Sequence, residues 1–504
     1  MLMLQGTASD VGKSLLATAL CRAFAREGRH VAPFKAQNMS LNAYVTPAGE
    51  EIGSAQGFQA EAAGVVPSAL MNPLLIKPMP GGTAQLIVAG RAAGAYDYTR
   101  VRSAREEHAA LVARSLTTLR ETHDLVIAEG AGSCAEINLR AWDLANMHVA
   151  QLSDAAVLLV GDIDKGGVYA SLLGALSLLS DADRRHVRGF IINKFRGDPS
   201  GLRLANDELE RRSGLPLLGV VPHLASHGLP EEDAASLDSA GTTRRGTMEE
   251  LELAVVRTPA LSNFDELRAL ADEPGVLLRF IDNPREVHGA DLVILAGSRA
   301  TLSDLRWLRE RGFDRALALR AVRGEPVLGV CGGCQMLAER IHDHAGVEAS
   351  GGSTEGLGLL PLEVHFAPEK RLARVEARSE HPLLRGPLLS GYFMHHGRAV
   401  PTHERVAPLL WITGGPEGER DGAVAGSVLG TMMHGLFEAP EVRRRVVHHL
   451  RSLRGEEPTA GVTSASADEG TPLRHPRDRV YDALAAQVCA ALDMPRLRAM
   501  VPRP

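Results

Sequence analysis

The stretch MLMLQGTASDVGKSLLA, Met1 to Ala17, decides the fold of the first part of the chain. Met1–Leu4 is largely apolar and predicts a buried strand, Gly6 to Val11 predicts a tight loop, and Gly12 to Ser14 opens a helix. In a strand, loop and helix of this order, the backbone N–H groups of the loop and the helix N-terminus converge on phosphate oxygens. We therefore expect the loop to hold the phosphates of a nucleotide.

The same loop carries the side chains that a nucleotide site uses. Lys13 supplies a positive charge, and Ser14 supplies a hydroxyl for Mg²⁺. Five residues lie between Gly6 and Gly12 where four are usual, and the alternative is a glycine turn before an ordinary helix. The longer loop, GTASDVGKS, resembles that of dethiobiotin synthetase-like ligases, which implies carboxylate activation by ATP. The residues expected to bind ATP are Gly6, Thr7, Asp10, Val11, Gly12, Lys13, Ser14 and Asn193.

Length and composition indicate a globular protein of two or three domains. A chain of 504 residues is too long for one core. The net charge is −6 and the Lys and Arg residues are dispersed, so we expect no nucleic-acid partner. We expect neither export nor membrane insertion, because no apolar stretch is long and uncharged enough. The five cysteines are odd in number and scattered, which favours a reducing cytoplasm over a disulfide framework.

Strands with polar ends follow the first loop and predict a parallel, doubly wound sheet. Leu125 to Ala128 is a buried strand that ends at Glu129, and two later apolar runs end at Asp162 and Asn193. A carboxylate at such a strand end binds Mg²⁺ as the acidic partner of a P-loop. We expect Ser14 and Glu129 to form the metal site, the alternative for Glu129 being an exposed strand end. Asn193 is placed to contact adenine.

A polar segment, PFKAQNMSLNAY, follows the strand predicted at His30 to Pro33. Ligands of open α/β sheets bind beyond the carboxyl ends of the strands, and the P-loop opens onto the same edge. We expect the segment to contact a substrate, although a solvated loop has the same composition. The substrate-binding candidates are Lys35, Gln37, Asn38, Ser40 and Asn42.

A second chemical centre lies in EPVLGVCGGCQMLAERI. Val327 to Val330 predicts a strand and Gln335 to Ile341 a helix, with Cys331 on the sharp turn between them. Such an elbow lifts a nucleophile clear of the sheet, and the helix N-terminus favours its thiolate. The C-x-x-C formed with Cys334 also permits a redox pair or half a zinc site. No second cysteine pair exists, however, and His434 at the end of another strand supplies the base of an acyl transfer.

The quoted motifs resemble known families. GVCGGCQML is similar to the nucleophile elbow of class I glutamine amidotransferases, which implies Cys331 as nucleophile, His434 as base, and backbone N–H groups of Gly297 and Gly332 as oxyanion donors. The motifs GTASDVGKS, PFKAQNMSLN, EGAGSCAEINL, GDIDKGGVYA, FIINKFRGD and LPEED together resemble the cobyric acid synthase family. That resemblance implies amidation, with ATP, Mg²⁺ and glutamine, of four carboxylates (b, d, e and g) of the corrinoid adenosylcobyrinic acid a,c-diamide. The product is adenosylcobyric acid, an intermediate of cobalamin biosynthesis.

One departure from the class I pattern bears on the mechanism. Those enzymes carry a glutamate two residues after the histidine, but Leu436 stands there in this chain. We therefore expect a Cys-His dyad. Two other functions stay open: a diamide synthase type of ligase for another tetrapyrrole, or a ParA-like ATPase switch with an inactive amidotransferase domain.

The expected architecture is an N-terminal doubly wound α/β sheet of P-loop, dethiobiotin synthetase-like type, followed by a class I glutamine amidotransferase α/β domain. Residues 1–225 form the ATP-binding synthetase domain, 226–250 a linker, and 251–450 the amidotransferase domain. We expect 451–479 to be a disordered spacer and 480–504 to carry a terminal helix.

Overall fold

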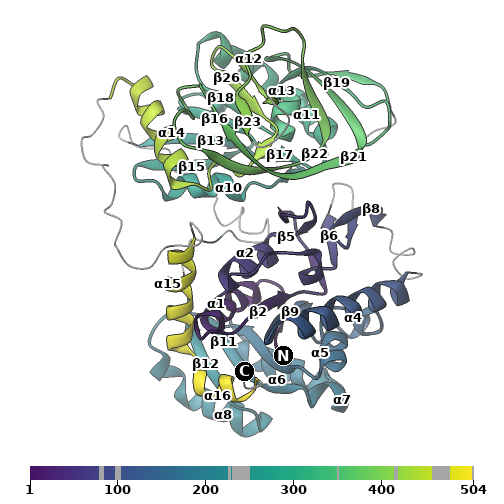
Figure 1. Ribbon diagram of the computed structural model, residues 1–504. Coiled ribbons are helices and arrows are strands. Elements are labelled where there is room, and N and C mark those ends of the chain that lie inside the picture. The colour runs from purple at the N-terminus through teal and green to yellow at the C-terminus, as the bar shows by residue number, and fades with distance from the viewer. Residues whose placement is uncertain are drawn as a thin grey trace. The chain divides into compact units, whose positions relative to one another are not determined.

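The computed structural model (Figure 1) describes residues 1–78, 84–96, 104–224, 229, 250–348, 351–413, 418–456 and 477–501. The chain divides into two compact units, which are described separately. The first contains Met1–Pro78, Thr83–Leu229 and Pro472–Pro504, and the second contains Met79–Gly82 and Pro230–Thr471. Most of the predicted linker, 226–250, and residues 457–476 of the predicted spacer lie outside the described residues. Within the described ranges, no helix is long and apolar enough to cross a membrane.

The first unit is built on a six-stranded sheet whose strands all run parallel. Successive residues of β1 face opposite sides, so Met3 joins one apolar core while Leu2 and Leu4 join another. Helices cover both faces, which confirms the doubly wound fold. In order across the sheet, the strands are β12 (Leu217–Pro222), β11 (Val187–Phe195), β10 (Ala156–Asp162), β1 (Leu2–Gly6), β9 (Leu125–Ser133) and β2 (Val31–Phe34).

Two layers of helices enclose this sheet. The core that contains Leu2 also takes side chains from α1 (Lys13–Arg26). The core that contains Met3 takes side chains from the helices between β8 and β12. These helices are α4 (Arg105–Thr122), α5 (Met147–Ser153), α6 (Val168–Leu178) and α8 (Arg203–Ser213). The short helix α7 (Asp181–Arg184) lies between α6 and β11 in the chain.

The segment after β2 forms a polar subdomain beside the P-loop. It contains α2 (Ser54–Ala63), which packs on α1, and a small sheet in the order β3, β6, β7, β8. The strands are β3 (Gln37–Met39), β6 (Leu74–Pro78), β7 (Ala84–Val88) and β8 (Arg91–Tyr96), with a separate pair formed by β4 (Ala43–Val45) and β5 (Glu51–Gly53).

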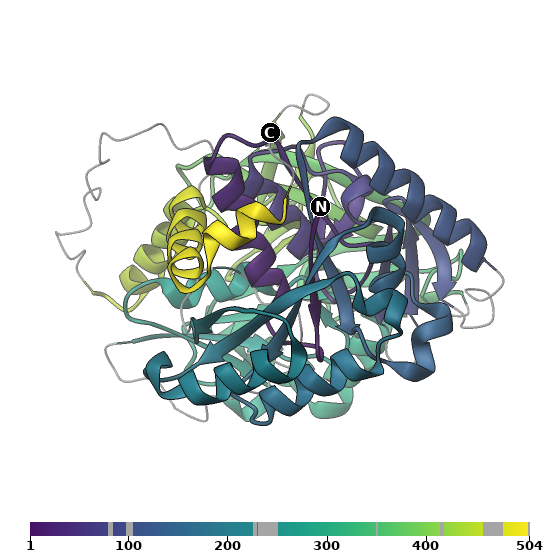
Figure 2. The same ribbon diagram turned by 90° about the horizontal axis from the view of Figure 1, so that it is seen from below.

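The C-terminal helix belongs to the first unit. The sequence predicts this helix but does not indicate which part of the chain it contacts. The helix α15 (Asp478–Ala491) lies along α1, as the yellow and purple helices in Figure 2 show, and α16 (Met494–Ala499) follows it. Arg22 of α1 pairs with Asp478 at 2.9 Å and Asp482 at 2.7 Å. The chain thus returns from the second unit to cover the helix that follows the P-loop.

The second unit combines a largely parallel sheet with a mixed one around a common core. The first has the order β15 (Val276–Ile281), β13 (Leu251–Val256), β16 (Leu292–Leu295), β18 (Val327–Val330), β26 (Val428–Thr431) and β25 (Ala423–Ala425), with only β25 antiparallel. The second has the order β20 (Ser353–Glu355), β19 (Ala338–His342), β21 (Leu360–Arg378), β22 (Leu389–Pro401) and β27 (Met433–His434), with β23 (Leu410–Thr413) and β24 (Arg420–Asp421) alongside. The remaining elements are β14 (Leu261–Ser262), α10 (Asp265–Arg268), β17 (Gly297–Ser298), α11 (Thr301–Arg311), α12 (Phe313–Val322), α13 (Gly332–Leu337) and α14 (Pro440–Leu453).

The helix predicted over Gln335 to Ile341 is wrong in its second half. The helix α13 ends at Leu337, and Ala338–His342 forms β19, which pairs with β20 and β21. The sequence Ala-Glu-Arg has high helix propensity, but a strand here gains two ladders of hydrogen bonds and buries Ile341 completely. Tertiary pairing therefore outweighs local preference.

Candidate active sites

The loop between β1 and α1 has the shape of a phosphate-binding loop. Gly12 has φ of 92°, and a Cβ there would lie 2.2 Å from Nδ2 of Asn193, so only glycine fits. Asp10 has φ of 57°. Lys13 folds back over the loop, where its Nζ donates to the carbonyls of Ala8 at 3.0 Å and Gly132 at 3.1 Å. Its charge is thus held at the centre of the loop.

Residues at the ends of neighbouring strands brace this loop. The Nδ2 of Asn193, at the end of β11, donates to the carbonyl of Val11 at 2.9 Å. Lys194 pairs with Asp162 at 3.0 Å and also donates to the carbonyl of Asp10. The amide donor of Asn193 is therefore engaged with the loop. Its predicted contact with adenine stays a prediction.

Glu129 lies in the middle of β9, opposite Leu4 of β1, and is 1% exposed. The strand does not end there as the sequence predicts, because β9 continues to Ser133 and pairs again with Gly6 after a shift in register. Its Oε1 accepts from Gln56 of α2 at 2.7 Å and pairs with Lys35 at 3.1 Å. Its Oε2 is buried without a hydrogen-bond partner. A buried carboxylate oxygen left in this way costs free energy unless a cation or donor meets it. The position therefore fits a ligand of a hard divalent cation.

The predicted substrate segment is largely buried, and only part of it lies at Glu129. Lys35 contacts the carboxylate directly, while Asn38 donates to Oε1 of Gln56 at 3.1 Å and so adjoins it through that side chain. The hydroxyl of Ser40 donates to the carbonyl of Asn42 at 2.8 Å. Both polar atoms of the Asn42 side chain are buried without a partner, which suits a ligand contact, whereas Gln37 is partly exposed.

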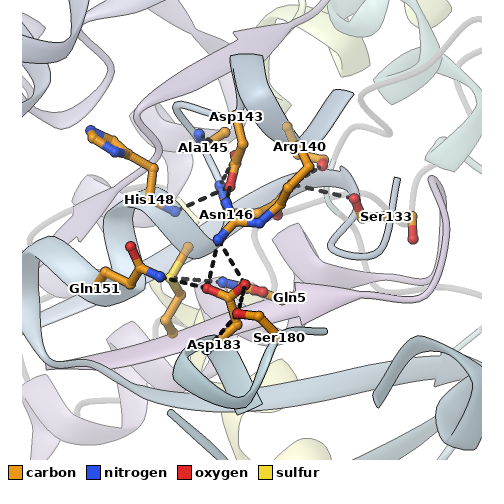
Figure 3. A network of polar contacts seen from close by, with 12 residues as sticks. Gln5, Ser133, Arg140, Asp143, Ala145, Asn146, His148, Gln151, Ser180 and Asp183 are labelled. Carbon is orange, nitrogen blue, oxygen red and sulfur yellow. Dashed lines mark hydrogen bonds and ion pairs between the residues drawn. The ribbon is translucent and has the colours of Figure 1, made fainter. Parts of the chain in front are cut away.

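A polar network around a buried carboxylate, shown in Figure 3, anchors the end of β9, which follows Glu129. Its centre is Asp183, which is fully buried and accepts from Nη2 of Arg140 at 2.6 and 2.7 Å. Gln151 and Ser180 each donate to the same carboxylate at 2.7 Å. Asn146 donates to the carbonyl of Ala131 at 2.8 Å. The network fixes the end of β9, where the carbonyl of Gly132 accepts a hydrogen bond from the lysine of the P-loop.

In the second unit, Cys331 occupies the elbow between β18 and α13. Its φ of 51° and ψ of −108° are strained for a residue with a side chain, as at other nucleophile elbows. Its N–H donates to the carbonyl of Thr431 at 2.7 Å. A Cβ at Gly332 would lie 2.6 Å from the backbone nitrogen of Ser298, and a Cβ at Gly333 would lie 1.9 Å from the carbonyl oxygen of Leu295. Glycine is therefore required on both positions after the cysteine.

The expectation of a Cys-His dyad is wrong, because Glu266 supports His434. Oε1 of Glu266 lies 3.0 Å from Nδ1 of His434. Its Oε2 accepts from the backbone N–H groups of Gly435 at 2.9 Å and Leu436 at 3.0 Å. The carboxylate comes from α10, far from the histidine in the sequence. One side chain thus orients the imidazole and fixes the loop that carries it.

The surroundings of His434 favour its protonated form. Burial alone would lower the pKa, but the Cys331 thiolate and the Glu266 carboxylate outweigh it and raise the pKa to about 10. The ring of Tyr392 stacks on the imidazole, with 5.2 Å between centroids and 19° between planes. A positively charged imidazole is therefore favoured between Cys331 and Glu266.

The structure also locates the remaining candidates of this centre. A Cβ on Gly297 would lie 3.1 Å from Cε1 of His434, so this strand end adjoins the base. Ser298, the other residue of β17, lies against Gly332, so this short strand also contacts the elbow. Cys334 is fully buried against Gly430, and burial raises its pKa well above the usual value. All five cysteines are free thiols, so Cys334 packs in the core.

Two family models match the chain in the order of these two units. Residues 2–233 match the CobQ/CobB/MinD/ParA nucleotide binding domain, and residues 252–442 match the CobB/CobQ-like glutamine amidotransferase domain. A cobyric acid synthase of Sorangium cellulosum (strain So ce56) is 45% identical over 97% of this chain and 96% of its own length. One of Chloroflexus aurantiacus (strain ATCC 29366 / DSM 635 / J-10-fl) is 45% identical over 97% of this chain and 98% of its own.

The chain belongs to the cobyric acid synthase family. The family resemblance of the motifs and the predicted fold class are thereby confirmed. The amidotransferase domain and the relatives make the chain a glutamine-dependent ligase.

Sequence reasoning missed three residues of these sites. Glu266 is one of two adjacent acidic residues early in the second core, and its spacing from His434 gives no hint of contact. Gln56 and Gln59 offered a better signal, because they lie three residues apart in a helix of small residues and face inward, both fully buried. Gln59 donates to the carbonyl of Ser14 at 3.4 Å, which places it beside the start of α1.

Proposed function

We propose that the protein uses ATP and glutamine to amidate the b, d, e and g carboxylates of adenosylcobyrinic acid a,c-diamide, giving adenosylcobyric acid. The observation that carries the proposal is the pairing, in one chain of this family, of a phosphate loop beside a buried carboxylate and a complete Cys331, His434 and Glu266 array. A free carboxylate has no leaving group, so ATP is needed to make it an acyl phosphate. Ammonia then displaces phosphate.

At the first site, the chain's own residues hold the phosphates and the acceptor. Lys13 and the loop N–H groups bind the phosphate oxygens, with Ser14 and the free Oε2 of Glu129 as the ligands for Mg²⁺. Bound there, the cation neutralises charge on the transferred phosphoryl group. Lys35, held by Glu129, and the buried amide of Asn42 are the groups that bind the corrinoid carboxylate. Asn38 and Ser40 support them.

At the second site, the thiolate of Cys331 attacks the side-chain amide of glutamine. His434 protonates the departing ammonia and then takes a proton from the water that cleaves the thioester. Glu266 keeps Nδ1 protonated, so that Nε2 faces the reaction. Backbone N–H groups at Gly297 and Gly332 stabilise the oxyanion. The five free thiols suit a reducing cytoplasm.

The test separates the two sites by their source of nitrogen. Cys331→Ala is expected to lose glutamine-dependent amidation of the corrinoid a,c-diamide, measured by mass spectrometry, and to keep amidation with ammonium salt. Cys334→Ala, a matched change in the core, is expected to keep both. If folded Cys331→Ala also loses the ammonium-driven reaction, the division of roles is wrong. If the wild type releases no glutamate from glutamine, the chain acts as a nucleotide-driven switch.

A further inference from the structure

Three side chains with metal-binding atoms meet on the mixed sheet of the second unit. His342 ends β19, and the parallel register pairs it with His365 of β21. Glu363 lies two residues before His365 and so projects from the same face of β21. The three ligand atoms all lie within 4.8 Å of one another. The cluster shares no residue with either site described above.

The distances within the cluster suit a shared cation better than direct hydrogen bonds. A single carboxylate oxygen, Oε2 of Glu363, lies 3.5 Å from Nε2 of His342 and 3.8 Å from Nε2 of His365. A charge-assisted hydrogen bond would bring such atoms to about 2.7–2.9 Å. In a tetrahedral zinc site, ligands at about 2.0–2.1 Å from the metal stand roughly 3.3–3.4 Å from each other. The two distances between histidine nitrogen and carboxylate oxygen, 3.5 and 3.8 Å, need to shorten by only about 0.1–0.5 Å to reach that geometry.

The partners of His342 point to the same conclusion. Its Nδ1 lies 2.8 Å from the hydroxyl of Ser353 in β20, and its Nε2 is buried without a hydrogen-bond partner. A hydroxyl that accepts from Nδ1–H fixes the tautomer whose Nε2 carries a lone pair, as the outer partner of a metal-binding histidine does. The imidazole rings of His342 and His365 stack with 4.6 Å between centroids and 15° between planes.

We propose that His342, Glu363 and His365 bind one divalent transition-metal cation of the zinc class, with water in the fourth position. Two imidazoles and one carboxylate form a donor set that such cations prefer to Mg²⁺ or Ca²⁺. The bound cation links β19, which directly follows the helix after Cys331, to β21, which pairs with the strand that carries Tyr392. It therefore acts as a clamp on the sheet that frames the glutaminase site, and it takes no part in the chemistry.

The test is titration of the chelator-treated full-length protein with Zn²⁺ alone, followed by calorimetry, with Co²⁺ as a spectroscopic probe. We expect one Zn²⁺ per chain, a higher melting temperature, and Co²⁺ absorption bands typical of nitrogen and oxygen ligands. His342→Gln and His365→Gln are expected to abolish the stoichiometric binding. Ser353→Ala is expected to weaken it roughly 10- to 100-fold. His403→Gln, on an exposed residue remote in sequence from the cluster, is the matched control and is expected to bind as the wild type does.

Glutaminase activity shows whether each variant is folded. Absence of stoichiometric Zn²⁺ binding by the wild type overturns the proposal. So does binding that survives in a folded His342→Gln and His365→Gln double variant, or a Co²⁺ spectrum with thiolate bands, which would assign the ion to Cys331.

Discussion

Replacing Glu266 by glutamine tests the support that the structure gives to His434. The change keeps the shape of the side chain but removes its charge, 3.0 Å from Nδ1 of the imidazole. An amide NH₂ facing Nδ1 favours the tautomer with its proton on Nε2, which then cannot take a proton from the thiol. In a Ser-His-Asp triad, the same carboxylate-to-amide change beside the histidine lowers kcat about 10⁴-fold. Because His434 keeps its contact with Cys331, glutaminase kcat is expected to fall roughly 10²- to 10⁴-fold, which corresponds to about 3–5 kcal/mol of transition-state stabilisation.

The assay compares glutamate release with ammonium-driven amidation, which is expected to stay within about twofold of the wild type because Glu266 has no part in phosphoryl transfer. Asp272→Asn, on an exposed carboxylate nearby in sequence, is the control. A Glu266→Gln enzyme that releases glutamate within threefold of the wild-type rate would refute the reasoning.

The same variant has a signature in the pH dependence of stability. The folded-state pKa of His434 is raised to about 10, above the value of about 6.5 in an unfolded chain. The pair therefore stabilises the fold fully below about pH 6.5, and its contribution is lost as the pH rises through 10. The loss of unfolding free energy in Glu266→Gln, measured with denaturant, is expected to be largest near pH 6 and to shrink toward pH 10. A deficit that does not change with pH contradicts this account.

Three further outcomes follow from the structure. Gly12→Ala is expected to abolish ATP binding in a calorimetric titration, because its Cβ collides with Asn193 and φ is 92°. The control Gly174→Ala, in an open helical position, is expected to bind ATP normally and to gain about 0.5–1 kcal/mol of stability. Equal ATP affinity in the two variants would contradict the loop geometry. Cys334→Ser is expected to keep glutaminase activity but to lower the melting temperature, since it places a hydroxyl in a fully buried apolar site. Because the sequence shows one P-loop for four amidations, partly amidated corrinoids are expected free in solution early in the reaction, and a labelled intermediate that resists chase by excess unlabelled substrate would show that the corrinoid is reoriented while bound.

The local features that could be predicted share one property: their signal lies in adjacent residues. Neighbouring residues alone predict the strand, glycine loop and helix from β1 to α1. The same holds for the elbow at Cys331, where β18 begins and ends as expected. The strand β19 is the contrary case. Its residues favour a helix locally, and only β20 and β21, which follow it in the chain, supply the hydrogen bonds that make it a strand.

The sequence by itself determined the class of each domain, the family, and the places of Lys13 after the glycine loop and Cys331 on the elbow, because glycine loops and elbows restrict the backbone within a few residues. Only the tertiary structure decided which carboxylate supports the histidine. Glu266 and His434 are separated by most of the second unit, and no periodicity links them; the folding of α10 against β27 brings the pair to 3.0 Å. The partners of Glu129 and the place of α15 on α1 were decided in the same way, since each depends on contacts between segments whose separation along the chain carries no signal.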